Sequence, residues 1–196
     1  MALAKQAKIL TKPQADAVLA YLSTTRYPVR DRVIFLLSVK AGLRAKEIAS
    51  LRWEMISDAE GHLSDLISLT DKASKGRSGR SIPLNKELKA ALSALKAKAD
   101  EAVRPSPFVV TSERDSPMSA AVIVNKFAGW YRALGFMGAS SHSGRRTFIT
   151  NAARRISTVG GSLRDVQLLA GHSALSTTQR YIEADGLAQR RVVDVI

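Results

Sequence analysis

A nearly unbroken apolar segment, VIFLLSV at residues 33–39, most constrains how this chain folds. Tyr27-Pro28 precedes the segment and Gly42 follows it. The spacing therefore predicts a helix over about residues 29–41 that begins after a proline and ends at a glycine cap. A helix that is apolar on all sides has to be buried. Because the segment is much shorter than the ~20 residues that span a bilayer, we expect a central helix of a globular domain and no membrane segment.

Capping signals predict a series of further helices. Thr11 and Gln14 have the spacing of a capping box, and Ser119 and Gly135 have the positions of the two ends of another helix. With apolar periodicity and helix-forming composition, these signals predict helices beginning after Thr11 and over residues 45–51, 85–101, 119–134, 143–156, 162–169 and 176–184. We expect the Ser-Thr-Thr cluster at 176–178 to cap the last of them.

The pattern changes between residues 61 and 84. Leu63 to Leu69 and Ser81 to Leu84 predict two short strands, and the basic, glycine-rich segment DKASKGRSGR between them is typical of an exposed hairpin loop. The chain shows no internal repeat and no long linker. We therefore expect a mainly α fold with a small antiparallel β-sheet, of the α+β class, in one domain over residues 1–196.

The charge balance indicates a polyanionic partner. Lys and Arg number 30 against 17 acidic residues, a formal net charge of +13, and the basic residues occur along the whole chain. Nucleic acid is the expected partner, because no segment combines a basic face with the Trp or Phe anchors of a membrane-surface helix. The chain has no cysteine, which excludes disulfides and thiolate zinc sites and fits a reducing compartment. MALAKQAKIL lacks the features of a signal peptide, so we expect an intracellular protein.

A small set of basic and aromatic residues has the chemistry that metal-free phosphoryl transfer needs. Arginine forks match the non-bridging oxygens of a phosphodiester, a tyrosine can attack phosphorus, and histidine and lysine can move protons. Taken singly, each has an ordinary explanation, such as a solvated helix start or a half-buried aromatic ring. The set comprises Arg44, Lys75, His142, Arg145, His172 and Tyr181. No acidic cluster or phosphate-binding glycine loop accompanies them, so we expect no cofactor.

Four sequence blocks, AGLRAKEIASL, KGRSGRSIPL, HSGRRTFIT and LLAGHSALSTTQRYI, resemble the tyrosine recombinases, also called the phage integrase family. The blocks have the order and spacing of that family and cover about residues 10–185, which leaves 186–196 as a C-terminal tail. The last block is the most specific of the four. The resemblance implies the catalytic-domain fold of these recombinases and a bacterial or phage protein that acts on double-stranded DNA in the cytoplasm.

The resemblance also implies a role for each residue of the set. Arg44, Arg145 and His172 resemble the phosphate-binding residues, and Tyr181 resembles the nucleophile that forms a 3′-phosphotyrosyl link. His142 is similar to the histidine that accepts a proton or hydrogen-bonds the phosphate. Lys75 resembles the hairpin lysine that protonates the leaving 5′-hydroxyl; we prefer it to Lys72 because its distance from Pro83 matches the register of the family's hairpin.

Two features depart from the family pattern. Gly144 and Arg146 replace the more usual residues beside Arg145, and a glycine at the start of a helix is expected to loosen that segment. The family usually has an N-terminal core-binding domain before the catalytic one. The chain is thus expected to be either a fragment or a short form without that domain, which would bind DNA less tightly. By resemblance, strand exchange implies a homotetramer on DNA, whereas the free protein could be a monomer.

Two other functions remain open at the level of sequence. A type IB topoisomerase-like enzyme shares the chemistry but reseals the strand that it nicked. A DNA-binding protein with a relic active site would share the charge but not the reaction; all six positions of the set are filled, which argues against decay. The DNA target sequence, and the choice among integration, excision and inversion, do not follow from these residues.

Overall fold

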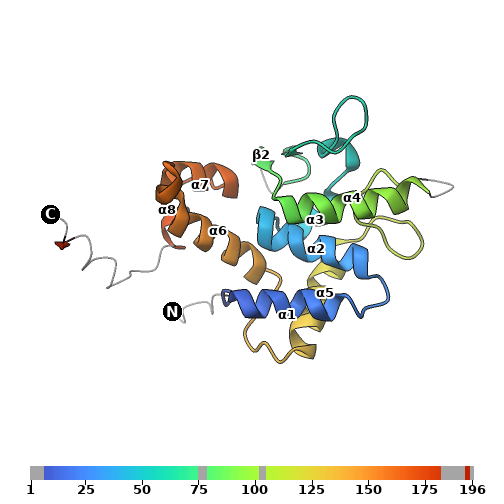
Figure 1. Ribbon diagram of the computed structural model, residues 1–196, viewed down its shortest axis with the longest axis horizontal. Coiled ribbons are helices and arrows are strands. Elements are labelled where there is room, and N and C mark those ends of the chain that lie inside the picture. Colours follow the sequence, from blue (N-terminus) through green and yellow to red (C-terminus); the bar gives the residue numbers. More distant parts are fainter. Residues whose placement is uncertain (1–6, 75–78, 102–104, 182–192, 195–196) are drawn as a thin grey trace.

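The computed structural model describes residues 7–74, 79–101, 105–181 and 193–194. Within these ranges the chain is mainly helical with one small sheet, as the sequence predicts (Figure 1). The elements are α1 (Lys12–Leu22), α2 (Pro28–Ala41), α3 (Ala45–Ser50), the 3-10 helix η1 (Trp53–Met55), β1 (Leu66–Leu69), β2 (Arg80–Pro83), α4 (Lys86–Asp100), α5 (Ala120–Ala133), α6 (Ser143–Arg155), the 3-10 helix η2 (Ile156–Val159), α7 (Leu163–Ala170) and α8 (Leu175–Gln179).

Helix α2 lies at the centre of the molecule, which its apolar sequence predicts. The side chains of residues 33–37 are fully buried, and α2 packs against α1, α3, α4 and α6 (Figure 1). Gly42 follows the helix with a left-handed φ of +66° and forms the C-cap. A glycine adopts this conformation without strain. The cap turns the chain directly into Arg44 and α3.

The two strands form an antiparallel hairpin at the edge of the core. Ile67 of β1 lies opposite Ile82 of β2, and both side chains are buried. β1 begins at Leu66, three residues later than the predicted strand. The fold class is therefore the expected one, with a sheet of two short strands in the described ranges.

Several caps are confirmed. Thr11 and Gln14 form the predicted capping box of α1, Ser119 Oγ accepts a hydrogen bond from the Val122 N–H at 3.3 Å, and Gly135 follows α5 with φ +67°.

The prediction for the end of the chain is wrong in two respects. Helix α8 runs from Leu175 to Gln179 where the sequence predicts a helix over 176–184, of which residues 182–184 lie outside the described residues. Its N-cap is Ala174, which makes no side-chain cap. The Ser-Thr-Thr cluster lies inside this helix, and the Thr178 hydroxyl bonds to the ring of His172 instead of capping the helix.

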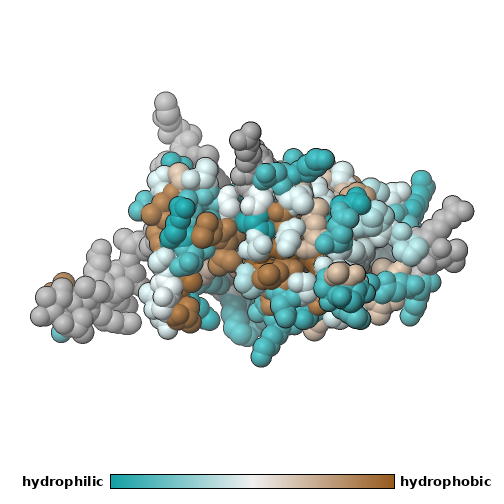
Figure 2. All heavy atoms as spheres, turned by 90° about the horizontal axis from the view of Figure 1, so that it is seen from above, coloured by the Kyte–Doolittle hydropathy of each residue, from teal (hydrophilic) through white to brown (hydrophobic). Residues whose placement is uncertain are grey.

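Apolar side chains form two clusters. The larger one surrounds α2. The smaller one lies between α6 and α7 and contains Ile149, Val166 and Ala170, with Tyr181 packed against it. At the same end of the molecule Leu168 and Leu175 are exposed, and Figure 2 shows hydrophobic patches among hydrophilic side chains there. No helix in the described part of the chain combines the length and hydrophobicity needed to cross a lipid bilayer.

Candidate active site

Arg145 is the structural centre of the candidate site. It lies in the first turn of α6 and is 4% exposed. One guanidinium nitrogen, Nη1, donates to the carbonyl of Gly42 at 2.6 Å, and Nη2 donates to the carbonyl of Ala170 at 2.6 Å. These carbonyls lie at the C-terminal ends of α2 and α7, where the helix dipole favours a cation. Burial, followed by repulsion from Arg44, lowers the pKa of Arg145 to about 10, so the guanidinium stays charged at neutral pH.

His172 contacts Arg145 directly. Its Nε2 lies 3.1 Å from Nη2 of Arg145, and its Nδ1 lies 3.0 Å from Oγ1 of Thr178. A guanidinium has donors and no acceptor, so Nε2 must accept and the imidazole proton lies on Nδ1. Burial and the neighbouring arginines, Arg145 first, lower the pKa of His172 to about 4, which agrees with a neutral ring.

Tyr181 lies beside His172, in a turn that follows α8. The two rings are stacked with centroids 5.5 Å apart and planes inclined by 23°. The Tyr181 N–H donates to the Thr178 carbonyl at 3.0 Å, and the Tyr181 carbonyl accepts from Oγ1 of Thr150 at 3.4 Å. Thr178 thus connects the backbone of Tyr181 with the ring of His172. The tyrosine lies just past the short helix and not within it, contrary to the sequence prediction.

Arg44 lies at the N-terminal end of α3, two residues after Gly42. Its Nη1 pairs with Oε1 of Glu47 at 2.9 Å, and its side chain is 25% exposed. The Arg44 charge lowers the pKa of both Arg145 and His172, so it acts on the same site electrostatically. The structure therefore brings four of the six predicted residues into one region, with Arg44 as the most accessible arginine of the set.

Of the other two predicted residues, His142 and Lys75, the structure describes only His142. His142 is the N-cap of α6 and is exposed. Among the described residues, no hydrogen bond joins its imidazole to Arg145, His172 or Tyr181. Lys75 lies outside the described residues. His62, the remaining histidine of the chain, is exposed beside Asp58.

Gly144 has a packing role that the sequence did not indicate. It lets α6 approach α2 closely: a Cβ at this position would collide with the Oγ of Ser38 and would lie 3.0 Å from Cγ1 of Val39. The glycine is fully packed in a regular helix. The close approach of the two helices places Arg145 within reach of the Gly42 carbonyl.

Sequence reasoning missed two residues of the site, Glu47 and Arg80. Glu47 is fully buried and receives hydrogen bonds from Arg44 and Arg80. An acidic residue three positions after a candidate arginine, at the start of a short helix, was a usable signal for Glu47. For Arg80, the hairpin sequence offers no signal, because its partner is distant along the chain. In the described part of the chain, no group of three His, Cys, Asp or Glu side chains could hold a metal ion.

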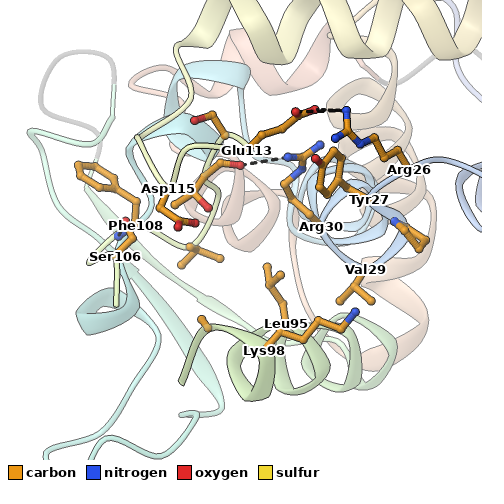
Figure 3. A pocket seen from close by; sticks show the side chains of 15 residues that line it. Arg26, Tyr27, Val29, Arg30, Leu95, Lys98, Ser106, Phe108, Glu113 and Asp115 are labelled. Atoms are coloured by element: carbon orange, nitrogen blue, oxygen red, sulfur yellow. Dashed lines mark hydrogen bonds and ion pairs between the residues drawn. The ribbon is translucent and has the colours of Figure 1, made fainter. Parts of the chain in front are cut away.

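A cavity of about 280 Å³ lies elsewhere in the molecule. Its lining includes Tyr27 and Arg30 from the start of α2, together with Lys98 from α4 and Phe108 (Figure 3). Helix α2 has 14 residues, so this end is about 20 Å from the Gly42 end. None of the five predicted residues that the structure describes lines the cavity, which is thus separate from the arginine site.

Comparison with known proteins identifies the family of this chain. Residues 8–186 match the model of the phage integrase family. The tyrosine recombinase XerC of Methylobacterium sp. (strain 4-46) is 31% identical over 157 residues, which cover 80% of this chain and 46% of that protein. The tyrosine recombinase XerA of Pyrococcus furiosus is 28% identical over 175 residues, which cover 89% of this chain and 56% of that protein.

Solved structures share the fold. The crystal structure of a XerA recombinase superimposes with a TM-score of 0.75 at 20% identity, covering 94% of this chain and 63% of the other. The structure of XerH site-specific recombinase bound to its difH substrate gives a TM-score of 0.74 at 16% identity, covering 100% of this chain and 56% of the other. The chain spans about half the length of the curated relatives it matches.

Proposed function

Because the chain belongs to the phage integrase family, we propose that it is the catalytic part of a site-specific DNA recombinase that cuts and rejoins DNA strands without metal or ATP. The observation that carries the proposal is the run of contacts from Arg145 through His172 to Tyr181, with Arg44 alongside. These groups combine a nucleophile with a positive, largely buried environment for a phosphate. Among the solved structures with this fold, XerH is a site-specific recombinase bound to its difH substrate.

The proposed reaction begins with attack by Tyr181 Oη on the phosphorus of a DNA strand. An O–P bond to the tyrosine forms while the bond from phosphorus to the 5′-oxygen breaks, which leaves a 3′-phosphotyrosyl link. His142 is proposed to accept the phenol proton or to hydrogen-bond the phosphate, and Lys75 to donate a proton to the leaving 5′-oxygen. A 5′-hydroxyl from a partner duplex then attacks the link, and the tyrosine leaves. Since phosphate esters are exchanged one for one, no external energy source is needed.

Arg44, Arg145 and His172 are proposed to bind the phosphate. Charge gathers on the non-bridging oxygens in the transition state, and preorganised donors in a dry site stabilise it. In the structure His172 Nε2 accepts from Arg145. For His172 to donate to a phosphate, the proton has to move to Nε2. The Thr178 hydroxyl suits this exchange because it can accept from Nδ1–H or donate to Nδ1.

Strand exchange between two duplexes requires four active sites, so we propose a homotetramer on DNA, with residues 10–185 as the catalytic domain of each protomer. Such a protein would work in the cytoplasm of a bacterium or a phage-infected cell. A topoisomerase-like enzyme, by contrast, would reseal the same strand. Joining of strands from two differently labelled duplexes distinguishes the two functions.

The test of the proposal uses Tyr181→Phe. Since the DNA target is unknown, the substrate is a random-sequence library of nicked duplexes that trap the cleaved strand, and covalent adducts are detected on denaturing gels and sequenced. The unmodified chain should form adducts, and Tyr181→Phe should form none while it retains DNA affinity, because the phenol oxygen alone is removed. Tyr21→Phe, a tyrosine of α1, is the matched control and should form adducts normally.

Adducts that persist in Tyr181→Phe would place the nucleophile elsewhere. DNA binding without any adduct in the unmodified chain would refute the recombinase proposal and favour a relic active site.

A further inference from the structure

Arg80 connects three elements that build the candidate site. It is the first residue of β2, and its side chain is 6% exposed. The guanidinium donates two hydrogen bonds to Glu47 of α3, from Nη1 to Oε1 at 2.9 Å and from Nη2 to Oε2 at 3.1 Å. Its Nε donates to the carbonyl of Leu169 in α7 at 2.9 Å. Paired, planar contacts of this kind fix the orientation of both partners.

Glu47 transmits this constraint to Arg44. Its Oε1 accepts from Nη1 of both arginines, and its Oε2 accepts from Nη2 of Arg80 and from the backbone N–H of Arg44 at 2.8 Å. The carboxylate is fully buried, so solvent offers it no alternative donors. The orientation of the Arg44 side chain consequently depends on how Arg80 holds the carboxylate.

Arg80 also preserves the positive charge of the site. One carboxylate is shared by two guanidiniums, so the group of Arg44, Arg80 and Glu47 retains an excess of one positive charge. If Arg80 were neutral, Glu47 would pair with Arg44 alone and would offset the charge that Arg44 offers to a phosphate. The Arg80 charge is among the causes that lower the pKa of Arg145 and of His172.

The same side chain shapes the turn that precedes His172. Gly171 has a left-handed φ of +62°, and a Cβ there would lie 2.9 Å from both Cδ and Nη1 of Arg80. The guanidinium therefore occupies the space next to this glycine. The Leu169 carbonyl that it binds lies three residues before His172. Arg80 thus lies against the turn that precedes the histidine, at Leu169 and at Gly171.

From these contacts we propose that Arg80 is a positioning residue of the phosphate site, which acts on DNA cleavage through Glu47–Arg44 and through the Gly171 turn. The inference rests on the proposed function. With its side chain 6% exposed and its three donor nitrogens engaged with Glu47 and Leu169, Arg80 is poorly placed to bind the DNA phosphate itself. Its loss should therefore slow chemistry more than it weakens binding.

The test compares Arg80→Lys and Arg80→Gln with the unmodified chain. Lysine keeps the charge but lacks the planar fork, so it cannot bind both Glu47 oxygens and Leu169 together. We expect single-turnover cleavage of the nicked duplex to slow on the order of 10²-fold in Arg80→Lys, as displaced catalytic groups do. Equilibrium affinity for the same duplex should change little.

A spectroscopic readout measures the electrostatic effect of Arg80 on His172. The chain has three histidines, so imidazole NMR signals can be assigned by substitution. In Arg80→Gln the pKa of His172 should rise because a repelling charge is removed. In Arg80→Lys, which keeps a positive charge, the pKa of His172 should rise less.

The matched control is Arg30→Lys. Arg30 is also a buried arginine, with a side chain 10% exposed, paired with Asp31 and bound to the Thr111 carbonyl, but it lies at the far end of α2. Its substitution should leave cleavage at the unmodified rate. If Arg80→Gln fails to fold because Glu47 is left unpaired, the double variant Glu47→Gln/Arg80→Gln removes that cause and should fold yet still cleave slowly.

Cleavage at the unmodified rate in Arg80→Lys and in the double variant would overturn the inference and leave the proposed function standing. Failure of the unmodified chain to form any adduct would overturn the proposed function, and this inference with it.

Discussion

At the scale of single residues, His172 shows how the fold changes an ordinary side chain. Burial and three arginines lower its pKa from 6.5 to about 4. The unfolded chain therefore takes up a proton at His172 as the pH falls below about 6.5, whereas the folded chain does so near pH 4. Proton uptake by the unfolded state favours unfolding, so His172 makes the protein less stable as the pH falls through this window.

We therefore expect the urea midpoint of unfolding to decrease between about pH 6.5 and pH 4.5, above the range in which most carboxylates titrate. His172→Gln cannot take up the proton and should flatten this dependence. His62→Gln replaces an exposed histidine and should leave it as it is. An equal slope in the His172→Gln variant would mean that other groups cause the loss of stability.

At the scale of secondary structure elements, the contact between α2 and α6 depends on Gly144. A Cβ at this position would collide with Ser38 and crowd Val39. Gly144→Ala should therefore push the two helices apart, and we expect it to lower the free energy of unfolding by about 1–3 kcal/mol, the usual cost of overpacking. Because Arg145 follows Gly144 directly, DNA cleavage should slow as well.

The control for this prediction is Gly129→Ala in α5, where a Cβ would meet no atom within 4 Å. An exposed helical glycine replaced by alanine should raise stability by about 0.5–1 kcal/mol. Calorimetry or chemical unfolding of both variants measures the difference. Equal effects of the two substitutions would show that helix propensity, and not the close approach of α2 and α6, decides the cost at Gly144.

At the scale of the whole molecule, we expect the formal charge of +13 to govern the proposed encounter with DNA. A protein that neutralises phosphates releases counterions, so its affinity falls linearly with salt on logarithmic axes. With about six to ten phosphate contacts, affinity for duplex DNA should fall roughly 10³- to 10⁵-fold between 50 and 200 mM salt. Fluorescence anisotropy with the uncleaving Tyr181→Phe variant measures the slope. A flat dependence would contradict binding through phosphates.

Much of the fold followed from local signals. The apolar segment before Gly42 predicted a buried central helix, and the Thr11 box predicted the start of α1, because caps and hydrophobic periodicity act over a few residues. The prediction for the last helix was wrong, because α8 ends at Gln179, before Tyr181. There Ala174 is the N-cap, and Thr178 bonds to the ring of His172, six residues before it, instead of capping the helix.

The candidate site was likewise predictable only in part from the sequence. The sequence by itself determined which residue types were available for phosphate chemistry. Short motifs, such as those around Arg44 and Tyr181, carry the resemblance to the family and can be recognised without the structure. The tertiary structure decided what those motifs leave open: that Arg145 is buried between two helix ends, that Gly144 permits this, and that Arg80 shares Glu47 with Arg44. These facts depend on side chains that meet from distant elements, and a buried charge has its energy set by such neighbours and not by its place in the chain.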